Sequence, residues 1–316
     1  MAFESRRDFI RISAGLALAP WANKLASGQA DGPKSTRLIL LGTQGGPARR
    51  MKGMRKSPAQ LILINNIPYV IDCGYEVAAQ LVSAGISLNR LRYIFITHHH
   101  SDHNAEYGNL VFLAFASGLR SRIDAYGPPP LAEMTRAFWE ANKYNVETRI
   151  KDQGTSDPRK LLVAHEFTHD GVVLEDENVK VTSTRVHHPP TDACAYRFDA
   201  KDRSIVISGD TAYSEALIQL AKGADVLVHE LMYLPIIQKL LAGNPNSPAL
   251  IERVKAVHTT GEEVGRVAAK AGVKTLVLSH LLNTAPDDGV SDEQWMEGIR
   301  DNFKGQIIVG RDLMEI

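Results

Sequence analysis

A cluster of four histidines within six residues constrains this chain more than any other feature of its sequence. The cluster directly follows the apolar run 93–96, which predicts a β-strand. Its members, with one aspartate between them, are His98, His99, His100, Asp102 and His103. Side chains two positions apart in extended chain point the same way, so we expect His98 and His100 to face one metal ion.

Asp102 and His103 stand at the start of a helix predicted over 104–119, where adjacent side chains diverge and can reach a second ion. Imidazole and carboxylate groups are the ligands that zinc prefers in proteins. The alternative is a solvated polar loop, which gives no reason for so many histidines at the end of a strand. The cluster therefore predicts a metal site at a strand-to-helix junction.

This stretch resembles the His-x-His-x-Asp-His motif of the metallo-β-lactamase superfamily, and the resemblance covers nearly the whole chain from residue 36. It implies an α/β fold, the four-layer αββα sandwich of two packed mixed β-sheets flanked by helices. Predicted strands and helices alternate without a clean linker or repeat, which suits two packed sheets. We therefore expect a single hydrolase domain over residues 36–316.

The resemblance also assigns two divalent metal ions, expected to be zinc, to seven residues. In chain order these are His98, His100, Asp102, His103, His188, Asp210 and His280. Asp210 falls on the position of the carboxylate that bridges the ions, and Asp72 on a structural position near the site. For the third histidine we choose His188 over its neighbour His187, because His188 directly precedes a Pro-Pro break.

A second resemblance is to the ribonuclease Z and arylsulfatase branch of the superfamily. Glu230, in His229-Glu230, and His258, in His258-Thr259-Thr260, match a glutamate and a histidine that lie beside the metals in that branch. We expect Glu230 and His258, together with Asp102, to be catalytic, because such groups orient a ligand or shuttle a proton. The alternative is a threonine that caps a helix and a histidine satisfied within the core.

These resemblances imply hydrolysis by a hydroxide that bridges the two ions, which lower its pKa to near neutral. The loop 45–56 holds five basic residues and no acid, which favours an anionic substrate unless the loop is merely solvated. We expect an exported hydrolase of small sulfate or phosphate esters. The alternatives are a lactone or β-lactam hydrolase, a ribonuclease Z-type endoribonuclease and a non-catalytic ligand-binding relative.

The charge balance argues against nucleic acid as a partner. Basic and acidic residues both number 36, so the formal net charge is zero and gives no bulk attraction to phosphates. In tRNA-processing ribonuclease Z, an arm that clamps tRNA is inserted between the third histidine and the bridging aspartate. Here only one predicted strand pair separates His188 from Asp210. We therefore expect a small-molecule substrate and no nucleic acid.

Residues 1–30 resemble a twin-arginine export signal. Arg6 and Arg7 precede Phe9-Ile10, and the apolar run 12–22 leads into small residues. That run is too short to be a stable membrane anchor, so a periplasmic or secreted protein is expected. The alternative is an amphipathic N-terminal helix of the domain. Despite the predicted export, the only two cysteines, Cys73 and Cys194, are predicted to be separate buried thiols.

Two further stretches carry alternatives of their own. His165-Glu166-Phe167-Thr168-His169 matches the zincin motif, which requires a helix. The apolar run before it and the Asp170-Gly171 turn after it predict a strand instead, so we expect no metal there. The almost wholly apolar stretch 231–242 is open to three interpretations: a buried helix, a lid over an apolar part of the substrate, or a homodimer contact.

Overall fold

The computed structural model describes residues 35–48, 55–282 and 290–316. The predicted export signal lies outside the described residues, as does most of the basic part of loop 45–56, so export stays a prediction. Lys34–Ile316 form one compact unit. In the part of the chain that is described, no helix is long and apolar enough to cross a membrane.

The first sheet has seven strands in the order β15-β1-β3-β4-β5-β6-β7. The strands β15, β1, β3 and β4 pair antiparallel, whereas β4 to β7 are parallel. Their bounds are β1 Arg37–Gly42, β3 Ala59–Ile64, β4 Ile67–Ile71, β5 Tyr93–Phe95, β6 Ile123–Gly127, β7 Leu162–Glu166 and β15 Met314–Glu315. The first sheet is therefore mixed, as predicted.

The second sheet follows the order β14-β13-β12-β11-β10-β9-β8, with β2 (Gln44–Gly45) paired beside β13. It is antiparallel from β8 to β11 and parallel from β11 to β14. The bounds are β8 Gly171–Glu175, β9 Val179–Val186, β10 Ala193–Ala200, β11 Ser204–Ile207, β12 Val226–Met232, β13 Thr275–Leu282 and β14 Gln306–Val309. This sheet is mixed as well.

The two sheets pack face to face around an aromatic core. Phe95 of the first sheet contacts Tyr196 and Phe198 of the second, with ring centroids 5.3 and 5.1 Å away, and aliphatic residues of both sheets complete the cluster. Strands such as β3 and β12 are buried along their whole length, because helices cover the outer face of each sheet.

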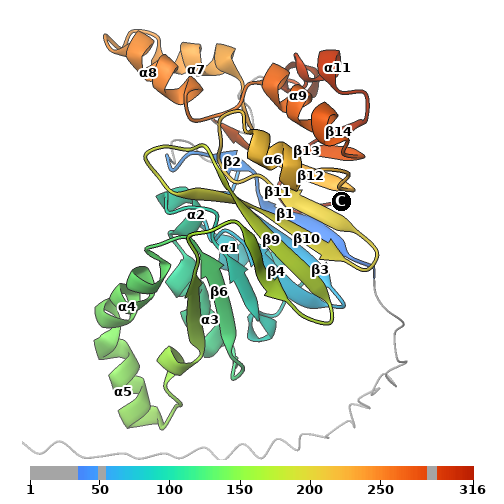
Figure 1. The fold of residues 1–316 in the computed structure, drawn as a ribbon. Coiled ribbons are helices and arrows are strands. Elements are labelled where there is room, and N and C mark those ends of the chain that lie inside the picture. Colours follow the sequence, from blue (N-terminus) through green and yellow to red (C-terminus); the bar gives the residue numbers. More distant parts are fainter. Residues whose placement is uncertain (1–34, 49–54, 283–289) are drawn as a thin grey trace, which may run out of the picture. The chain divides into compact units, whose positions relative to one another are not determined.

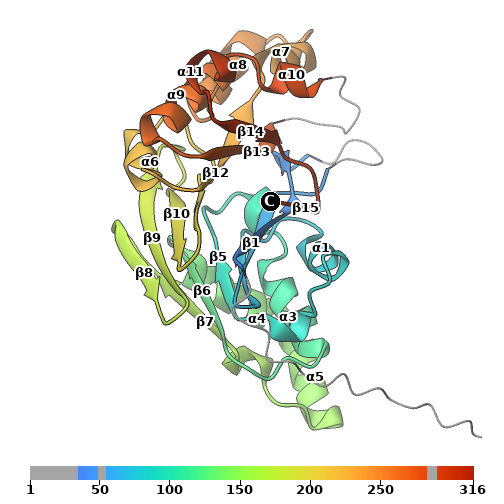
Figure 2. The ribbon, with the colours of Figure 1, turned by 90° about the vertical axis from the view of Figure 1, so that its right-hand side faces the viewer.

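Helices form the two outer layers (Figures 1 and 2). Apolar faces of α1, α3 and α4 join the first sheet in one cluster, and those of α6, α9 and α11 join the second sheet in another. Their bounds are α1 Val77–Ser83, α3 Tyr107–Ala116, α4 Leu131–Ala141, α6 Glu215–Leu220, α9 Gly261–Ala271 and α11 Ile299–Asn302. The observed architecture is the predicted four-layer sandwich.

The remaining helices connect these layers. They are α2 Ser101–Asn104, α5 Lys143–Gln153, α7 Leu234–Leu241, α8 Ser247–Lys255 and α10 Asp292–Trp295, with short 3-10 turns at Leu88–Arg90 and Pro158–Lys160. The single helix predicted over 104–119 is in fact divided between α2 and α3. The break is held by Cys73, whose N–H donates to His103 O and whose carbonyl accepts from Glu106 N–H. Cys73 and Cys194 are free and buried, as predicted.

Candidate metal centre

The ends of strands from both sheets meet at the histidine cluster. The stretch Thr97–His103 follows β5, Asp210 follows β11, and His280 lies near the end of β13. His188 comes from the turn between β9 and β10. Each half of the chain therefore supplies part of the centre, and all seven predicted ligands come together.

A buried aspartate organises the first half of the centre. Both carboxylate oxygens of Asp72 accept from Thr97, Oδ1 from its N–H at 2.8 Å and Oδ2 from its hydroxyl at 2.9 Å. Oδ2 also lies 2.7 Å from Nδ1 of His103. An aspartate in this place fixes the imidazole with its proton on Nδ1 and leaves Nε2 directed into the centre.

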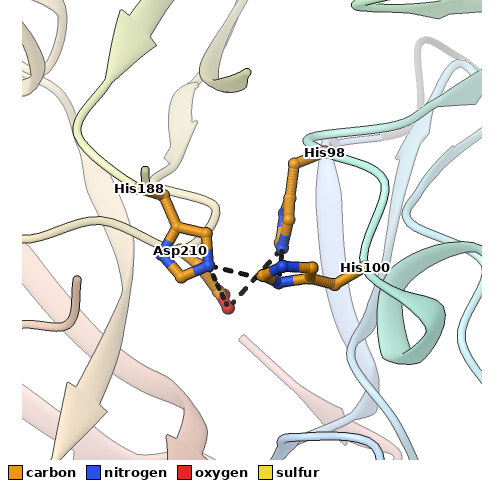
Figure 3. A group of neighbouring side chains, drawn as sticks. All are labelled: His98, His100, His188 and Asp210. Carbon is orange, nitrogen blue, oxygen red and sulfur yellow. Dashed lines mark hydrogen bonds and ion pairs between the residues drawn. The ribbon is translucent and has the colours of Figure 1, made fainter. Parts of the chain in front are cut away.

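The first group of ligand-type atoms comes from His98, His100, His188 and Asp210, as Figure 3 shows. Nδ1 of His100 lies 3.0 Å from Nε2 of His98 and 3.2 Å from Nε2 of His188. Oδ2 of Asp210 lies 3.8 and 3.9 Å from the same two Nε2 atoms. Tetrahedral Zn–N bonds of about 2.0–2.1 Å put neighbouring ligand atoms about 3.3 Å apart, which is close to these spacings.

The second group is formed by Asp102, His103 and His280. The other oxygen of Asp210, Oδ1, faces this group and lies 3.3 Å from Nε2 of His103 and 3.2 Å from Nε2 of His280. Oδ2 of Asp102 lies 3.6 and 3.5 Å from the same two nitrogens. One oxygen of Asp210 thus faces each group, which is the geometry of a bridging carboxylate.

Unsatisfied buried atoms test whether this centre suits a cation. Among the described residues, the buried atoms that make no hydrogen bond include Nε2 of His103, Oδ1 of Asp210 and both ring nitrogens of His280. Buried polar groups are normally paired, because leaving one unpaired costs about 1–3 kcal/mol. A divalent cation would satisfy three of these atoms at once. The residues present fit metal binding.

The pKa values of residues in the centre also bear on metal binding. Burial holds the pKa of His98 well below its usual range and also lowers the pKa of His188, so both imidazoles are neutral ligands. Burial alone would raise the pKa of Asp210, but the positive charge of neighbouring imidazoles outweighs it and holds that pKa well below its usual range. In return, Asp210, Asp72 and Asp102 outweigh burial and hold the pKa of His103 well above its usual range, so a metal ion bound there would displace a proton from His103.

Glu230 and His258 lie together beside the two groups. Nδ1 of His258 is 3.2 Å from Oε1 of Glu230, which also accepts from the backbone N–H groups of Thr211 and Thr259. Burial lowers the pKa of His258, but the charge and hydrogen bond of Glu230 outweigh it and raise the pKa to about 9. The ring of His258 lies 5.1 Å from that of His188. The predicted pair is therefore beside the centre, while Thr260 caps α9.

Comparison with known proteins places this arrangement in a family. The β-lactamase superfamily domain matches residues 68–281, about two thirds of the chain. The chain belongs to the metallo-β-lactamase superfamily. Among solved metallo-β-lactamase folds, the Bacillus subtilis protein YhfI is similar with a TM-score of 0.66 and 19% identity, over 89% of this chain and 98% of that one. The short form of human tRNase Z gives a TM-score of 0.62 at 20% identity, with the same coverage.

Curated relatives of this chain include ribonucleases Z. The ribonuclease Z of Mycobacterium bovis (strain BCG / Pasteur) is 30% identical over 275 residues, which cover 83% of this chain and 92% of the relative. The ribonuclease Z of Mycobacterium sp. (strain KMS) is 30% identical over 282 residues, covering 88% and 95%. The likeness therefore extends over nearly the full length of both relatives.

These relatives overturn two predictions made from the sequence. The predicted function, an exported hydrolase of small sulfate or phosphate esters, is wrong, because the relatives are named for ribonuclease activity. The predicted absence of nucleic acid is wrong for the same reason. Net charge describes the whole surface and gives no information about the charge around a single site. The short connection between His188 and Asp210 excludes one way of clamping tRNA and does not exclude RNA.

The structure also places the other histidines of the sequence. His187 is exposed, and its N–H donates to Thr211. His99 points away from the centre, with Nε2 2.8 Å from the carbonyl of Pro128. His165 lies on β7, stacked on Tyr126 at 4.7 Å, and is in none of the metal-competent groups found among the described residues. The zincin-like stretch is therefore not a helix, as predicted, and His165 lies on a strand; His169, also predicted on a strand, lies instead in the connection between β7 and β8.

Replacing His165 or His169 with alanine should therefore leave metal content and hydrolysis at the wild-type level. His165 contacts Asp124 and Tyr126 at the edge of the first sheet, so its loss should have only a small effect on stability. Elemental analysis and phosphodiesterase assays of both variants test this. Loss of metal from either variant would return the zincin motif to consideration.

Two glycines in the first loop were missed as part of the centre. A side chain at Gly45 would put its Cβ 2.7 Å from Nδ1 of His280, so the close approach of β2 to that imidazole requires glycine. The N–H of Gly46, whose φ is +83°, donates to Oδ2 of Asp102 at 2.9 Å. The adjacent Gly45-Gly46 pair was the available signal, because paired glycines mark a close backbone approach.

A cavity of about 720 Å³ opens over the metal centre. Its floor includes His100, Asp102, His188, Asp210 and His280, and His258 lines it as well. Much of the remaining wall comes from the hairpin formed by α7 and α8. The cavity lies within the size range of small-molecule sites, about 300–1,000 Å³, and gives a substrate direct access to the centre.

Proposed function

We propose that this protein is a metal-dependent endoribonuclease of the ribonuclease Z type, which hydrolyses a phosphodiester bond in RNA. The observation that carries the proposal is the Glu230–His258 pair beside a two-part His/Asp centre, in a chain 30% identical to ribonuclease Z over 92% of that relative. Such a centre suits hydrolysis of a bond whose departing group needs a proton.

Two metal ions would occupy the centre, with zinc fitting the nitrogen and oxygen ligands. One ion would be held by His98, His100 and His188, the other by Asp102, His103 and His280, with Asp210 contributing one oxygen to each. When bound, the ions would activate a water molecule and neutralise charge that develops on the phosphate. The supporting observation is the direction of the two oxygens of Asp210.

The chain's own residues would then position the substrate and move a proton. His258, charged at neutral pH, would donate the proton on its second ring nitrogen to the departing ribose oxygen. Glu230 would hold the imidazole of His258 in place, since the N–H groups of Thr211 and Thr259 donate to the same carboxylate and fix it. The N–H of Gly46 would orient Asp102, so that the predicted role of Asp102 is to hold metal and direct the nucleophile.

The purified protein should contain close to two equivalents of zinc per chain, because seven ligand-type residues converge and three of their buried nitrogens lack a hydrogen-bond partner. Elemental analysis after dialysis against metal-free buffer measures this directly. Treatment with a chelator should abolish activity, and added zinc should restore it. A protein with only traces of zinc, iron and manganese would rule out the proposed centre.

The function itself is tested by cleavage of RNA. A labelled transfer-RNA precursor and an unstructured RNA oligonucleotide, each incubated with the zinc-loaded protein, should give discrete products whose ends are mapped by sequencing. An Asp210→Asn sample prepared in parallel controls for contaminating nucleases. Intact RNA after incubation with a protein that hydrolyses methyl p-nitrophenyl phosphate would show a phosphodiesterase that does not act on RNA.

A further inference from the structure

The hairpin of α7 and α8 presents an unusual face to the cavity. The cavity-lining residues of the first arm are Ile237, Leu240, Leu241 and Asn244, and those of the second are Leu250, Arg253, Val254 and Val257. Ile237, Leu240 and Leu241 have the spacing i, i+3 and i+4 on α7, and Leu250, Arg253 and Val254 have the same spacing on α8, which places each set on one side of its helix. Asn244 and Val257 follow the ends of the two helices. The two stripes therefore present mainly aliphatic side chains to the cavity above the metal centre.

Much of this face lies outside the main apolar cores, although Ile237, Leu241 and Val254 belong to a small apolar cluster. No residue of α8 is buried, and the buried residues of α7 are Ile236 and Ile237. Leu240 has 45% of its surface exposed although it lines the cavity. Aliphatic side chains held in this way leave apolar area in contact with water, which is unfavourable in free energy. An apolar part of a bound ligand would recover that free energy.

Arg253 adds a positive charge to the same wall. It is exposed, lines the cavity, and makes no side-chain hydrogen bond or ion pair with any other residue that the structure describes. Among the described residues that line the cavity, the acidic ones are Asp102 and Asp210, both in the metal centre. A guanidinium group binds phosphate oxygens in pairs, or lies flat on a base. The charge is therefore available to an anionic ligand that also reaches the metals.

We propose that the α7–α8 face is a nucleotide subsite, which takes the base next to the scissile phosphate against its aliphatic stripes and the flanking phosphate on Arg253. This rests on the proposed function, since the same cavity contains the metal centre that would hold the scissile phosphate. An aliphatic wall alone would also suit an alkyl chain. Arg253 on α8 and Asn244 just beyond α7 add a positive charge and an amide to the same wall, which favours a ligand with polar edges and a second negative charge.

Arg253→Gln and Leu240→Ser test the two parts of the subsite. Lys239→Gln and Gln238→Ser are the matched controls, because both residues are exposed on α7 and do not line the cavity. Each variant is assayed on an RNA oligonucleotide with a mapped cleavage site, on the same RNA with an abasic residue beside that site, and on methyl p-nitrophenyl phosphate. Zinc content and circular dichroism confirm that each variant is loaded and folded.

Arg253→Gln should lower kcat/KM for RNA about tenfold or more, as expected for loss of a charge-assisted contact, and leave hydrolysis of methyl p-nitrophenyl phosphate unchanged. Leu240→Ser should reduce the preference of the wild type for natural over abasic RNA. If the wild type cleaves RNA and both variants cleave it as fast as the wild type, the proposed subsite is wrong and the proposed function is retained. If the wild type prefers a long-chain alkyl phosphodiester to RNA, or does not cleave RNA at all, both proposals fail.

Discussion

Replacing Asp210 with alanine should lower phosphodiesterase activity about a thousandfold or more. Metal ions contribute several kcal/mol to transition-state stabilisation, and about 1.4 kcal/mol corresponds to a factor of ten in rate. The two oxygens of Asp210 face different ligand groups, so the substitution removes one ligand from each ion. Zinc content measured by elemental analysis should fall below two equivalents, and kcat should fall with it.

Two further measurements separate this effect from misfolding. Asp210→Asn retains the volume of the side chain and should lose nearly as much activity, because the charge and one metal-binding oxygen are gone. Asp210 lies outside the apolar core clusters, so the metal-free variant and the metal-free wild type should melt at similar temperatures. Wild-type turnover in Asp210→Ala would show that this carboxylate does not bridge the ions.

His258→Ala should have the second largest effect, but only on substrates whose leaving group needs a proton. Loss of a general acid costs about 10²–10⁴-fold. RNA releases a ribose oxygen and should be cleaved that much more slowly by the variant. Methyl p-nitrophenyl phosphate releases p-nitrophenolate, which leaves without protonation, so its hydrolysis should remain close to the wild-type rate. Measuring kcat on both substrates gives the two effects side by side.

Glu230→Gln is the companion variant. It retains the hydrogen-bonding shape of the side chain but removes the charge that keeps His258 protonated, so it should affect the same substrate in the same direction and less severely. Equal losses on both substrates in His258→Ala would indicate that His258 binds metal instead. That outcome has a structural basis, because His258, Asp210 and His280 also form a metal-competent group.

The convergence of the candidate ligands could be predicted because it depends on local order. A strand end fixes which residues face the same way, and His98 and His100 do lie together, while the motif order predicted that Asp210 and His280 lie near them, as they do in the structure. No such rule distinguishes His187 from His188, which are adjacent in the turn between β9 and β10. The structure directs His188 inwards through a hydrogen bond of its ring to the carbonyl of Val257, a partner 69 residues away.

Other features depended on distant partners and were beyond prediction. The break between α2 and α3 is set by the backbone of Cys73, about 30 residues earlier in the chain. The stretch 231–242 had three interpretations because an apolar stripe is satisfied equally well by a core, a ligand or another chain. Its first two residues end β12, Ile236 and Ile237 belong to a small apolar cluster, and Ile237, Leu240 and Leu241 line a cavity. The likeness to ribonucleases was discounted because overall charge carries no information about one wall of one cavity.

The division of the ligands between the two sheets has a mechanical consequence. Three candidate ligands, His188, Asp210 and His280, come from the second half of the chain, and four come from the stretch 98–103. Each ion would therefore link segments that lie more than 80 residues apart in the sequence. A bound ion would then link the two sheets of the sandwich. Neither half of the chain could then hold the ions with its own ligands alone, and chelation would leave the two sheets held together by the apolar core between them.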